Sequence, residues 1–348
     1  MTDDWKELEL DTWKEIPFVS VCTPTFNRRP FIEMMVKCFD HQTYPKDKIE
    51  WIIFDDGTDK IADLVAGHPN VKYFPYDEKM RLGKKRNLMH EKTTGDIIVY
   101  MDDDDYYPPE RITHAVFKLL TNPEALCGGS SIMYMYFKHI GKIYKFGPYG
   151  DNHSTAGTFA FKKKLLEQTK YDETAALAEE KEFLKNYTIP FVQFDPFKTI
   201  LVFSHENNTF DKTTLIENIN NNLVKETGLT IDYFIKDNDL KQYMLKDIDL
   251  ILEKYEQGHI CLKPDVLKQR LDMETKRRMD LEKRLQKDSP TPEIMIKPEN
   301  GEPKRMSISE VVELLQKQHK MLHRQLLDIQ GKNTEIALLK SQLVELSK

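Results

Sequence analysis

Residues 97–109 read IIVYMDDDDYYPP, an apolar run that ends in four adjacent carboxylates. The apolar residues 97–101 predict a buried strand. Four neighbouring carboxylates repel one another unless a cation lies among them, and a hard divalent metal ion prefers such oxygen ligands. If the segment is extended, Asp102 and Asp104 face the same way and can share one metal ion, while Asp103 points elsewhere, toward a ribose hydroxyl. The alternative is a solvated acidic turn.

Two further strand ends carry polar or aromatic residues suited to a ligand. Asp56 follows the apolar run 50–54, and Phe26 follows the run 18–22. The carboxyl ends of parallel strands meet in one crevice, where ligands bind. We expect Phe26 to stack on a base and Asp56 to accept from a base N–H. Arg86, in the basic run 84–86, is expected to pair with a diphosphate or to hold Asp104, unless the run is a basic helix face in water.

Short apolar runs alternate with helical patterns from residue 16 to residue 205, which is typical of the α/β class. The predicted strands are residues 18–22, 50–54, 71–74, 97–101, 132–137, 158–161 and 200–203, and the predicted helices are residues 30–39 and 83–94. Residues 1–15 are an N-terminal extension. Residues 206–262 have Leu and Ile at helical spacing and are predicted as a helical extension.

The C-terminal part differs in composition. Residues 263–287 are predicted as a charged helix, and residues 288–306 contain four prolines and are predicted as a linker. Within residues 307–348 apolar side chains recur every seven residues, at Ile308, Leu315, Leu322, Ile329, Ile336 and Leu343. This repeat predicts a coiled coil and therefore a homo-oligomer, with Asn333 helping to choose the number of chains. The alternative is an amphipathic helix packed on the globular part.

Five segments together resemble a known family in their order and spacing. Residues 19–27, 42–45, 55–58, 83–87 and 100–109 are similar to family 2 nucleotide-sugar glycosyltransferases of the GT-A fold, a Rossmann-like mixed sheet flanked by helices. The resemblance covers residues 16–205. It implies that Pro24, Phe26 and Asp56 line a uridine pocket, that Arg86 lies beside the diphosphate, and that Asp102, Asp103 and Asp104 form an Asp-x-Asp motif holding Mn²⁺ or Mg²⁺.

The same resemblance implies a general base that takes the proton of the acceptor hydroxyl. An inverting enzyme needs a carboxylate within about 3 Å of that hydroxyl. Glu180 falls where the family places this residue, and Glu179 or Glu182 could serve instead. The family usually has Asp at this position, so Glu180 is a departure. A charged helix start is the ordinary alternative.

A small polar loop, residues 152–157, and a histidine further along the chain, His205, complete the candidate site. Residues 152–157 concentrate small and polar side chains, and we expect Asn152, His153, Thr155 and Gly157 to bind a sugar of the donor or acceptor. His205 follows the apolar run 200–203. The resemblance implies that it completes the coordination of the metal, as a histidine does in some GT-A enzymes, whereas a lone histidine is more often structural.

Composition and charge limit which partners and which cellular compartment we expect for the protein. The 348 residues are 40% hydrophobic and 31% charged, with a net charge of −6, and the excess of acidic residues lies in residues 1–262. This charge disfavours nucleic acid as a partner. No apolar run is long enough to span a membrane, and four scattered cysteines and a polar start predict a cytoplasmic protein.

The sequence thus predicts a metal-dependent, inverting glycosyltransferase that moves a sugar from a nucleotide donor, UDP, to a glycan, protein or small-molecule acceptor. The alternative from another class is a non-catalytic GT-A-like scaffold assembled by its coiled coil. A dehydrogenase or a nucleotidyltransferase is disfavoured because residues 23–29, after the first predicted strand, contain no glycine.

Overall fold

The computed structural model divides the chain into two compact units, residues 1–271 and residues 272–348. It describes residues 15–175, 180–205, 208, 212, 214–217, 222–259, 262–269, 271–272, 275–276, 278–279, 293–296, 304–307, 310–319, 321–322, 325 and 332. Each unit is described by itself. Within the described residues no helix has both the length and the apolar character needed to cross a membrane.

A seven-stranded mixed sheet forms the centre of the first unit, in the order β3-β2-β1-β4-β8-β5-β9. The strands are β1 (Val19–Thr25), β2 (Ile49–Asp55), β3 (Val71–Pro75), β4 (Ile97–Tyr100), β5 (Cys127–Gly129), β8 (Ala160–Lys162) and β9 (Phe191–Gln193). β1 to β4 are parallel to one another, whereas β8 runs antiparallel to both β4 and β5. All seven residues of β2 are buried, because layers cover both faces of the sheet.

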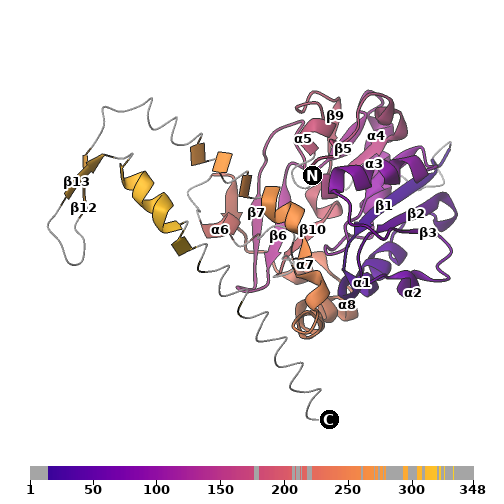
Figure 1. Ribbon diagram of the computed structural model, residues 1–348. Coiled ribbons are helices and arrows are strands. Elements are labelled where there is room, and N and C mark those ends of the chain that lie inside the picture. Colours follow the sequence, from indigo (N-terminus) through magenta and orange to yellow (C-terminus); the bar gives the residue numbers. More distant parts are fainter. Residues whose placement is uncertain are drawn as a thin grey trace, which may run out of the picture. The chain divides into compact units, whose positions relative to one another are not determined.

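Alternate residues of the central strands send side chains into two cores, one on each face. The first core joins Val21 of β1 to helix α1 (Arg29–Asp40) and helix α4 (Arg111–Thr121). The second core joins Cys22 of β1 to helix α3 (Leu82–Lys92) and helix α5 (Glu180–Phe183). Helices α1 and α3 accordingly lie on opposite sides of the sheet (Figure 1). The short helix α2 (Ala62–Val65) contacts β3.

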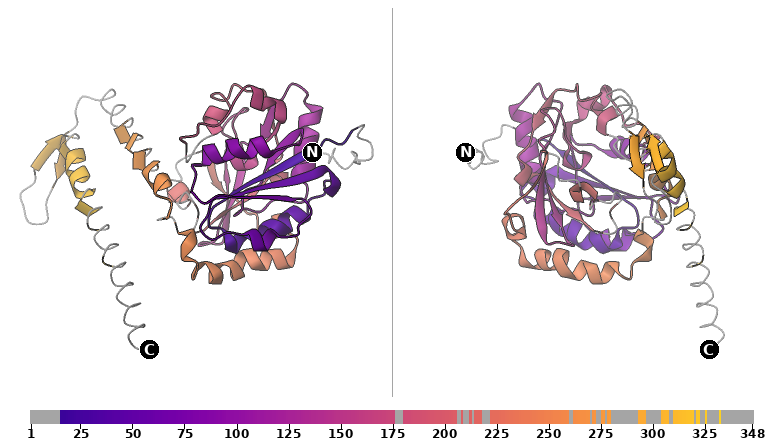
Figure 2. Two further views of the ribbon diagram at one scale, coloured as in Figure 1. Left: turned by 45° about the vertical axis from the view of Figure 1, so that its right-hand side comes forward. Right: turned by 90° about the vertical axis from the view of Figure 1, so that its left-hand side faces the viewer.

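A four-stranded sheet lies beside the first, in the order β10-β6-β7-β11. Its strands are β6 (Met133–Phe137), β7 (Lys142–Phe146), β10 (Leu201–Ser204) and β11 (Val224–Glu226). The segment after β10 contains α6 (Thr214–Glu217), α7 (Ile231–Phe234), α8 (Asn238–Gln242), a π-helical turn (Tyr243–Asp247) and α9 (Ile248–Leu252). α9 packs on α1, as both views of Figure 2 show. Short 3₁₀ turns span Lys46–Lys48, Ala156–Thr158, Lys163–Glu167, Pro196–Lys198 and Glu256–Gly258.

The predicted strands all appear, with ends shifted by up to three residues, and both predicted helices of the α/β region appear as α1 and α3. The mixed α/β sheet with flanking helices agrees with a GT-A fold. Four short strands, β5, β7, β9 and β11, were not predicted. β11 lies in the segment predicted as helical, and it exists through pairing with β7, far away in the sequence. Local periodicity does not report such pairing.

In the second unit, β12 (Glu293–Ile296) and β13 (Lys304–Ser307) form an antiparallel pair with Glu293 opposite Ser307. β12 and most of β13 fall within the segment predicted as a linker, so at least those residues have regular structure. Residues 310–319 are helical. Of the predicted heptad positions, Leu315 and Leu322 are exposed in this chain, and the other four lie outside the described residues. The coiled coil therefore stays a prediction.

Candidate functional site

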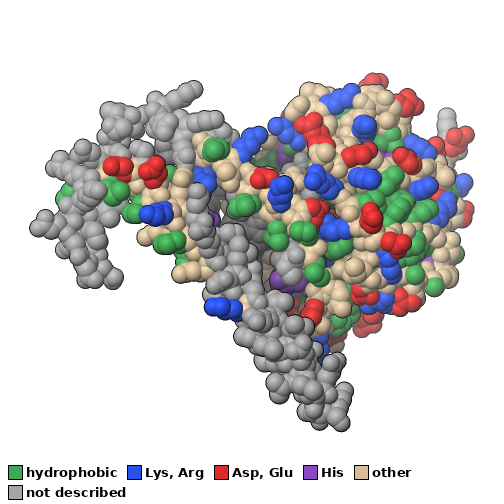
Figure 3. Space-filling model, viewed as in Figure 1, with side chains coloured by type: hydrophobic (Ala, Val, Ile, Leu, Met, Phe, Trp, Pro, Cys, Tyr) green, Lys and Arg blue, Asp and Glu red, His purple; other side chains and the backbone are tan. Residues whose placement is uncertain are grey.

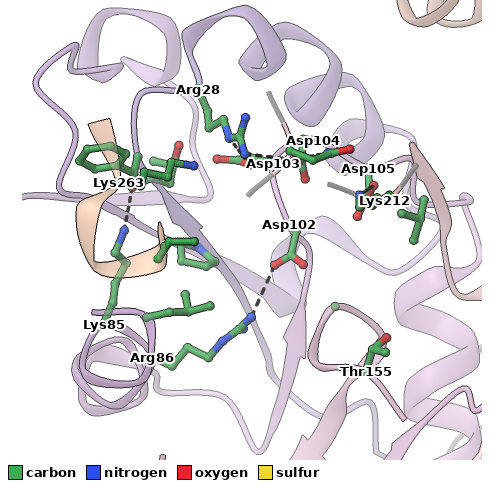
Figure 4. A pocket seen from close by; sticks show the side chains of 18 of the residues that line it. Arg28, Lys85, Arg86, Asp102, Asp103, Asp104, Asp105, Thr155, Lys212 and Lys263 are labelled. Atoms are coloured by element: carbon green, nitrogen blue, oxygen red, sulfur yellow. Dashed lines mark hydrogen bonds and ion pairs between the residues drawn. The ribbon is translucent and has the colours of Figure 1, made fainter. Parts of the chain in front are cut away.

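A cavity of about 390 Å³ opens at the carboxyl ends of β1 and β4. Its wall includes residues from four regions: Pro24 of β1 with Phe26 and Arg28 after it; Lys85 and Arg86 of α3; Asp102 to Asp105 after β4; and Met133, Met135 and Val202 of the second sheet with Ile200 just before β10. Thr155 and Gly157 line it as well. Figure 4 shows the charged side chains pointing toward one another around this space. Segments predicted to share a crevice are thus brought together.

The four carboxylates do not follow the extended arrangement assumed from sequence. Residues 103–105 bend, because the backbone N–H of Asp102 donates to the Tyr107 hydroxyl at 2.7 Å and Tyr106 pairs with Leu201. Asp102 consequently faces Arg86, with 3.9 Å between Oδ1 and NH2. Asp104 lies on the other side, near Arg28 (Figure 4). The expectation that Asp102 and Asp104 face the same way is not met.

Asp104 meets His205 instead. Oδ2 of Asp104 lies 3.4 Å from Nε2 of His205, and the side-chain amide of Asn208 donates to both atoms, at 3.3 and 2.8 Å. Burial lowers the pKa of His205 to about 4, so its ring is neutral at pH 7. The lone pairs of Asp104 Oδ2 and His205 Nε2 therefore point to one place, where the side-chain amide of Asn208 lies.

Burial and neighbouring basic groups act in opposite directions on the pKa values of Asp103, Asp104 and Asp105. Burial raises the pKa of Asp103 and of Asp105 to about 7, even though Arg28 and Lys212 oppose the shift. Burial would also raise the pKa of Asp104, but Arg28 and His205 hold it well below its usual range. Burial therefore dominates the pKa shifts of Asp103 and Asp105, whereas neighbouring basic groups dominate that of Asp104. Within the described residues no group of three or more His, Cys, Asp or Glu side chains is arranged to hold a metal ion.

Arg86, Lys79 and Lys263 bring basic groups to the cavity wall. The guanidinium of Arg86 lies 4.3 Å from the ring centre of Tyr100, and its side chain is only 3% exposed. Lys79 and Lys263 place their ammonium groups 5.2 and 5.8 Å from the ring centre of Phe26. On the outer face seen in Figure 3, acidic and basic side chains intermingle. Arg28 and these lysines were not singled out from the sequence.

Asp56, expected to bind a base, is engaged by groups of the protein itself. Lys85 Nζ bonds to Oδ1 of Asp56, and the backbone N–H of Met80 donates to Oδ2 at 2.6 Å. The carboxylate is fully buried and does not line the cavity among the described residues. A buried lysine needs a partner, and Asp56 meets that need, so each of its oxygens already accepts a hydrogen bond from the protein itself.

The polar loop 152–157 is divided by the fold. Thr155 and Gly157 line the cavity, and a Cβ on Gly157 would lie 2.7 Å from Oδ2 of Asp102. Asn152 instead donates to the Tyr187 carbonyl at 3.2 Å, and His153 packs between Tyr149 and Tyr187. Those two residues lie outside the set that lines the cavity.

The candidate base is not in the cavity wall either. Glu180 is the first residue of α5 and lies outside the described residues that line the cavity. Glu182 is exposed, and Glu179 lies outside the described residues. The role of Glu180 stays a prediction.

Comparison with known proteins shows which family part of the first unit resembles. Residues 20–176 match the model of glycosyl transferase family 2. Glycosyltransferase AglE of Haloferax volcanii is 33% identical over 94 residues, which cover 26% of this chain and 31% of AglE. The poly(ribitol-phosphate) β-N-acetylglucosaminyltransferase TarS of Staphylococcus aureus is 27% identical over 101 residues, which cover 28% of this chain and 18% of TarS.

Solved structures with a similar arrangement include the mannosyltransferase PcManGT of Pyrobaculum calidifontis in complex with GDP-Man and Mn²⁺. It is 16% identical, with a TM-score of 0.46 over 73% of this chain and 78% of that one. The chain spans less than a third of the length of AglE and of TarS. The family match includes β1, β2, α3, β4 and the acidic segment that build the cavity. Residues 20–176 of this chain are therefore similar to glycosyl transferase family 2.

Proposed function

We propose that the protein is a metal-dependent glycosyltransferase that moves a sugar from a uridine diphosphate donor to an acceptor hydroxyl with inversion. The observation that carries the proposal is the convergence of Phe26, Arg86 and the carboxylates 102–105 on one cavity. An aromatic ring, a guanidinium and oxygen ligands are the groups that a base, a diphosphate and a hard cation require.

The base and the diphosphate occupy the end of the cavity formed by β1 and α3. Phe26 offers its ring to the uracil, and Pro24 continues that apolar surface. Arg86 stands toward the diphosphate. Because Asp102 lies beside its guanidinium, Arg86 is held in place before the donor binds.

Asp104 and His205 are the residues that would hold Mn²⁺ or Mg²⁺. Their donor chemistry fits, because a carboxylate oxygen and a neutral imidazole nitrogen face each other and share the amide of Asn208, which a cation would replace. Such ions are commonly bound by one or two protein groups together with substrate phosphates. When bound, the metal would neutralise charge on the departing diphosphate.

The acceptor side is the wall formed by the second sheet. Met133, Met135, Ile200 and Val202 make it apolar, and Thr155 adds a hydroxyl at its edge. The general base, which takes the proton from the acceptor hydroxyl, must reach the acceptor from this side. Glu180 is the candidate for that role, and Glu180→Gln keeps the size of the side chain while removing its ability to take a proton. We expect turnover to fall about 100-fold at unchanged donor affinity. Near-normal turnover would exclude Glu180.

Calorimetric titration of the full chain with UDP and with GDP, each with and without Mn²⁺, tests the proposal. We expect UDP to bind more tightly with Mn²⁺ than without it, and more tightly than GDP. A panel of UDP-sugars then identifies the transferred group through release of UDP. Absence of binding by both nucleotides in the presence of Mn²⁺ would refute the function, and binding without release of UDP in the presence of acceptors would favour the scaffold alternative.

The C-terminal repeat is proposed to assemble the enzyme into a homo-oligomer. Leu315 and Leu322 are exposed in the single chain, with 58% and 63% of their surfaces accessible. Pairing with a second copy would bury such side chains.

A further inference from the structure

Three aromatic side chains pack together outside the set of described residues that line the cavity. His153 lies between Tyr149 and Tyr187, with ring centres 5.0 and 4.9 Å apart, and the three residues form the aromatic cluster. The imidazole supports the ring of Tyr149, yet 42% of Tyr149 is exposed. A supported tyrosine ring offers a ligand an apolar face and a hydroxyl at little cost in conformational entropy.

Hydrogen bonds hold the loop of the cluster, residues 149–153, to two other segments. The side-chain amide of Gln193 in β9 donates to the His153 carbonyl at 3.1 Å. The side-chain amide of Asn152 donates to the Tyr187 carbonyl at 3.2 Å. Three segments that are distant in sequence are thereby joined at one place. The cluster is therefore positioned before any ligand arrives, which reduces the entropy cost of binding.

The turn that presents Tyr187 is strained. Lys185, Asn186 and Tyr187 have φ values of 48°, 56° and 63°, in the left-handed region that residues with a side chain seldom adopt. The backbone N–H of Asn186 donates to the Lys181 carbonyl at 2.9 Å, which holds the turn against α5. Strained backbone of this kind persists where the surrounding structure enforces it, and it gathers at binding sites. The turn therefore points to a ligand at the side chain that it presents.

The aromatic cluster borders the acceptor side of the cavity. The backbone N–H of Tyr149 donates to the Ser131 carbonyl at 3.3 Å, and Ser131 precedes Met133 of the cavity wall by two residues. His153 likewise precedes Thr155, which also lines the cavity, by two residues. Two residues of chain span at most about 7 Å. A ligand of ordinary size can therefore contact the cluster and the cavity wall at once.

The candidate general base lies near the same cluster. Burial raises the pKa of Tyr187, and the carboxylate of Glu180 adds to this shift. Electrostatic effects between groups that are partly exposed fade within about 10 Å. Tyr187 and Glu180 are therefore neighbours, so the cluster stands close both to the cavity and to the residue proposed to take the proton of the acceptor.

We propose that the aromatic cluster binds a sugar unit of the acceptor, next to the unit whose hydroxyl attacks the donor. The inference rests on the proposed function and deepens it by naming the acceptor class, an oligosaccharide. A pyranose ring carries C–H groups on its faces and hydroxyls around its edge. The ring face of Tyr149 takes the C–H groups, while its hydroxyl and the amide of Asn152 take the sugar hydroxyls. An aliphatic acceptor would leave these polar groups without hydrogen bonds.

An array of immobilised oligosaccharides, built from hexoses, N-acetylhexosamines and hexuronic acids, tests the inference on the full chain, with and without UDP and Mn²⁺. We expect the wild type to bind at least one of them. Tyr149→Ala should weaken that binding at least 10-fold because the ring face is lost, whereas Tyr149→Phe should keep most of it. Tyr233→Ala removes another exposed tyrosine, one that does not line the cavity, and as the matched control should bind as the wild type does.

The outcomes distinguish this inference from the proposed function. Calorimetry with Mn²⁺ should give the same UDP affinity for the wild type and for each of these variants. If the wild type binds neither UDP nor GDP, the proposed function fails and the inference with it. If the wild type binds UDP but none of the oligosaccharides, or if Tyr149→Ala binds them as tightly as the wild type, the inference is wrong and the function stands. Weaker UDP binding by Tyr149→Ala, in a variant that circular dichroism shows to be folded, would also overturn the inference, because the ring would then belong to the nucleotide site.

The support that His153 gives to Tyr149 has its own test. His153→Ala removes the ring that packs between the two tyrosines. We expect oligosaccharide binding to weaken, by less than in Tyr149→Ala, with UDP affinity unchanged. His153→Phe keeps an aromatic ring at this place and should restore most of the binding. Unchanged oligosaccharide affinity in His153→Ala would refute the positioning role of His153.

Discussion

A buried histidine should make the first unit lose stability as the pH falls. His90 of α3 is 6% exposed, and its Nε2 lies 2.6 Å from the Tyr100 hydroxyl. Burial lowers the pKa of His90 to about 3, and the neighbouring Arg86 acts in the same direction. In the unfolded chain a histidine titrates near pH 6.5. The folded state therefore favours the neutral ring.

The sign and size of the effect follow from proton linkage. Because the folded pKa lies below the unfolded one, the contribution of His90 is fully present above about pH 6.5 and is lost as the pH falls toward 3. At pH 5 the unfolded state has taken up a proton that the folded state refuses. The free energy of unfolding should consequently be about 2 kcal/mol lower at pH 5 than at pH 7 on account of this residue alone.

The assay is urea unfolding at pH 7 and pH 5, followed by tryptophan fluorescence, since all three tryptophans lie in residues 1–271. His90→Gln should lose about 2 kcal/mol less than the wild type over this interval, whatever its stability at pH 7. His139→Gln, which changes an exposed histidine, should behave as the wild type does. If His90→Gln and the wild type lose the same free energy, the reasoning is wrong.

Three further results are expected. Asp104→Asn should weaken the Mn²⁺-dependent part of UDP binding at least 10-fold in calorimetry, and full retention of that part would remove Asp104 from the metal site. Gly157→Ala should raise the donor KM several-fold without changing the fold, because the added Cβ would lie 2.7 Å from an oxygen of Asp102 and displace it; an unchanged KM in steady-state kinetics would contradict this geometry. Ending the chain after Leu271 should give a monomer that still binds UDP, while the full chain should scatter light as a dimer or trimer, and a monomeric full chain would exclude the coiled-coil oligomer.

Much of the site could be predicted because its chemistry is concentrated in short segments. The apolar run 97–101 and the carboxylates after it mark a strand and its polar end, and Phe26 and Arg86 are recognisable in the same way. The four carboxylates, Phe26 and Arg86 all line the same cavity in the structure. These residues share one cavity because strands of a parallel sheet end at one edge, so residues placed after them meet in one crevice whatever the details of packing.

What the sequence determined by itself is therefore local: which segments form strands and helices, which face of each is apolar, and which residues follow the strand ends. Only the tertiary structure decided which partner each charged side chain meets. It turned Asp102 toward Arg86 and Asp104 toward His205, engaged both oxygens of Asp56, and brought Lys263 to Phe26. The physical reason is that periodicity in a sequence reports the environment of one element, whereas an ion pair between distant residues depends on how separate elements pack and on which buried charges must be neutralised.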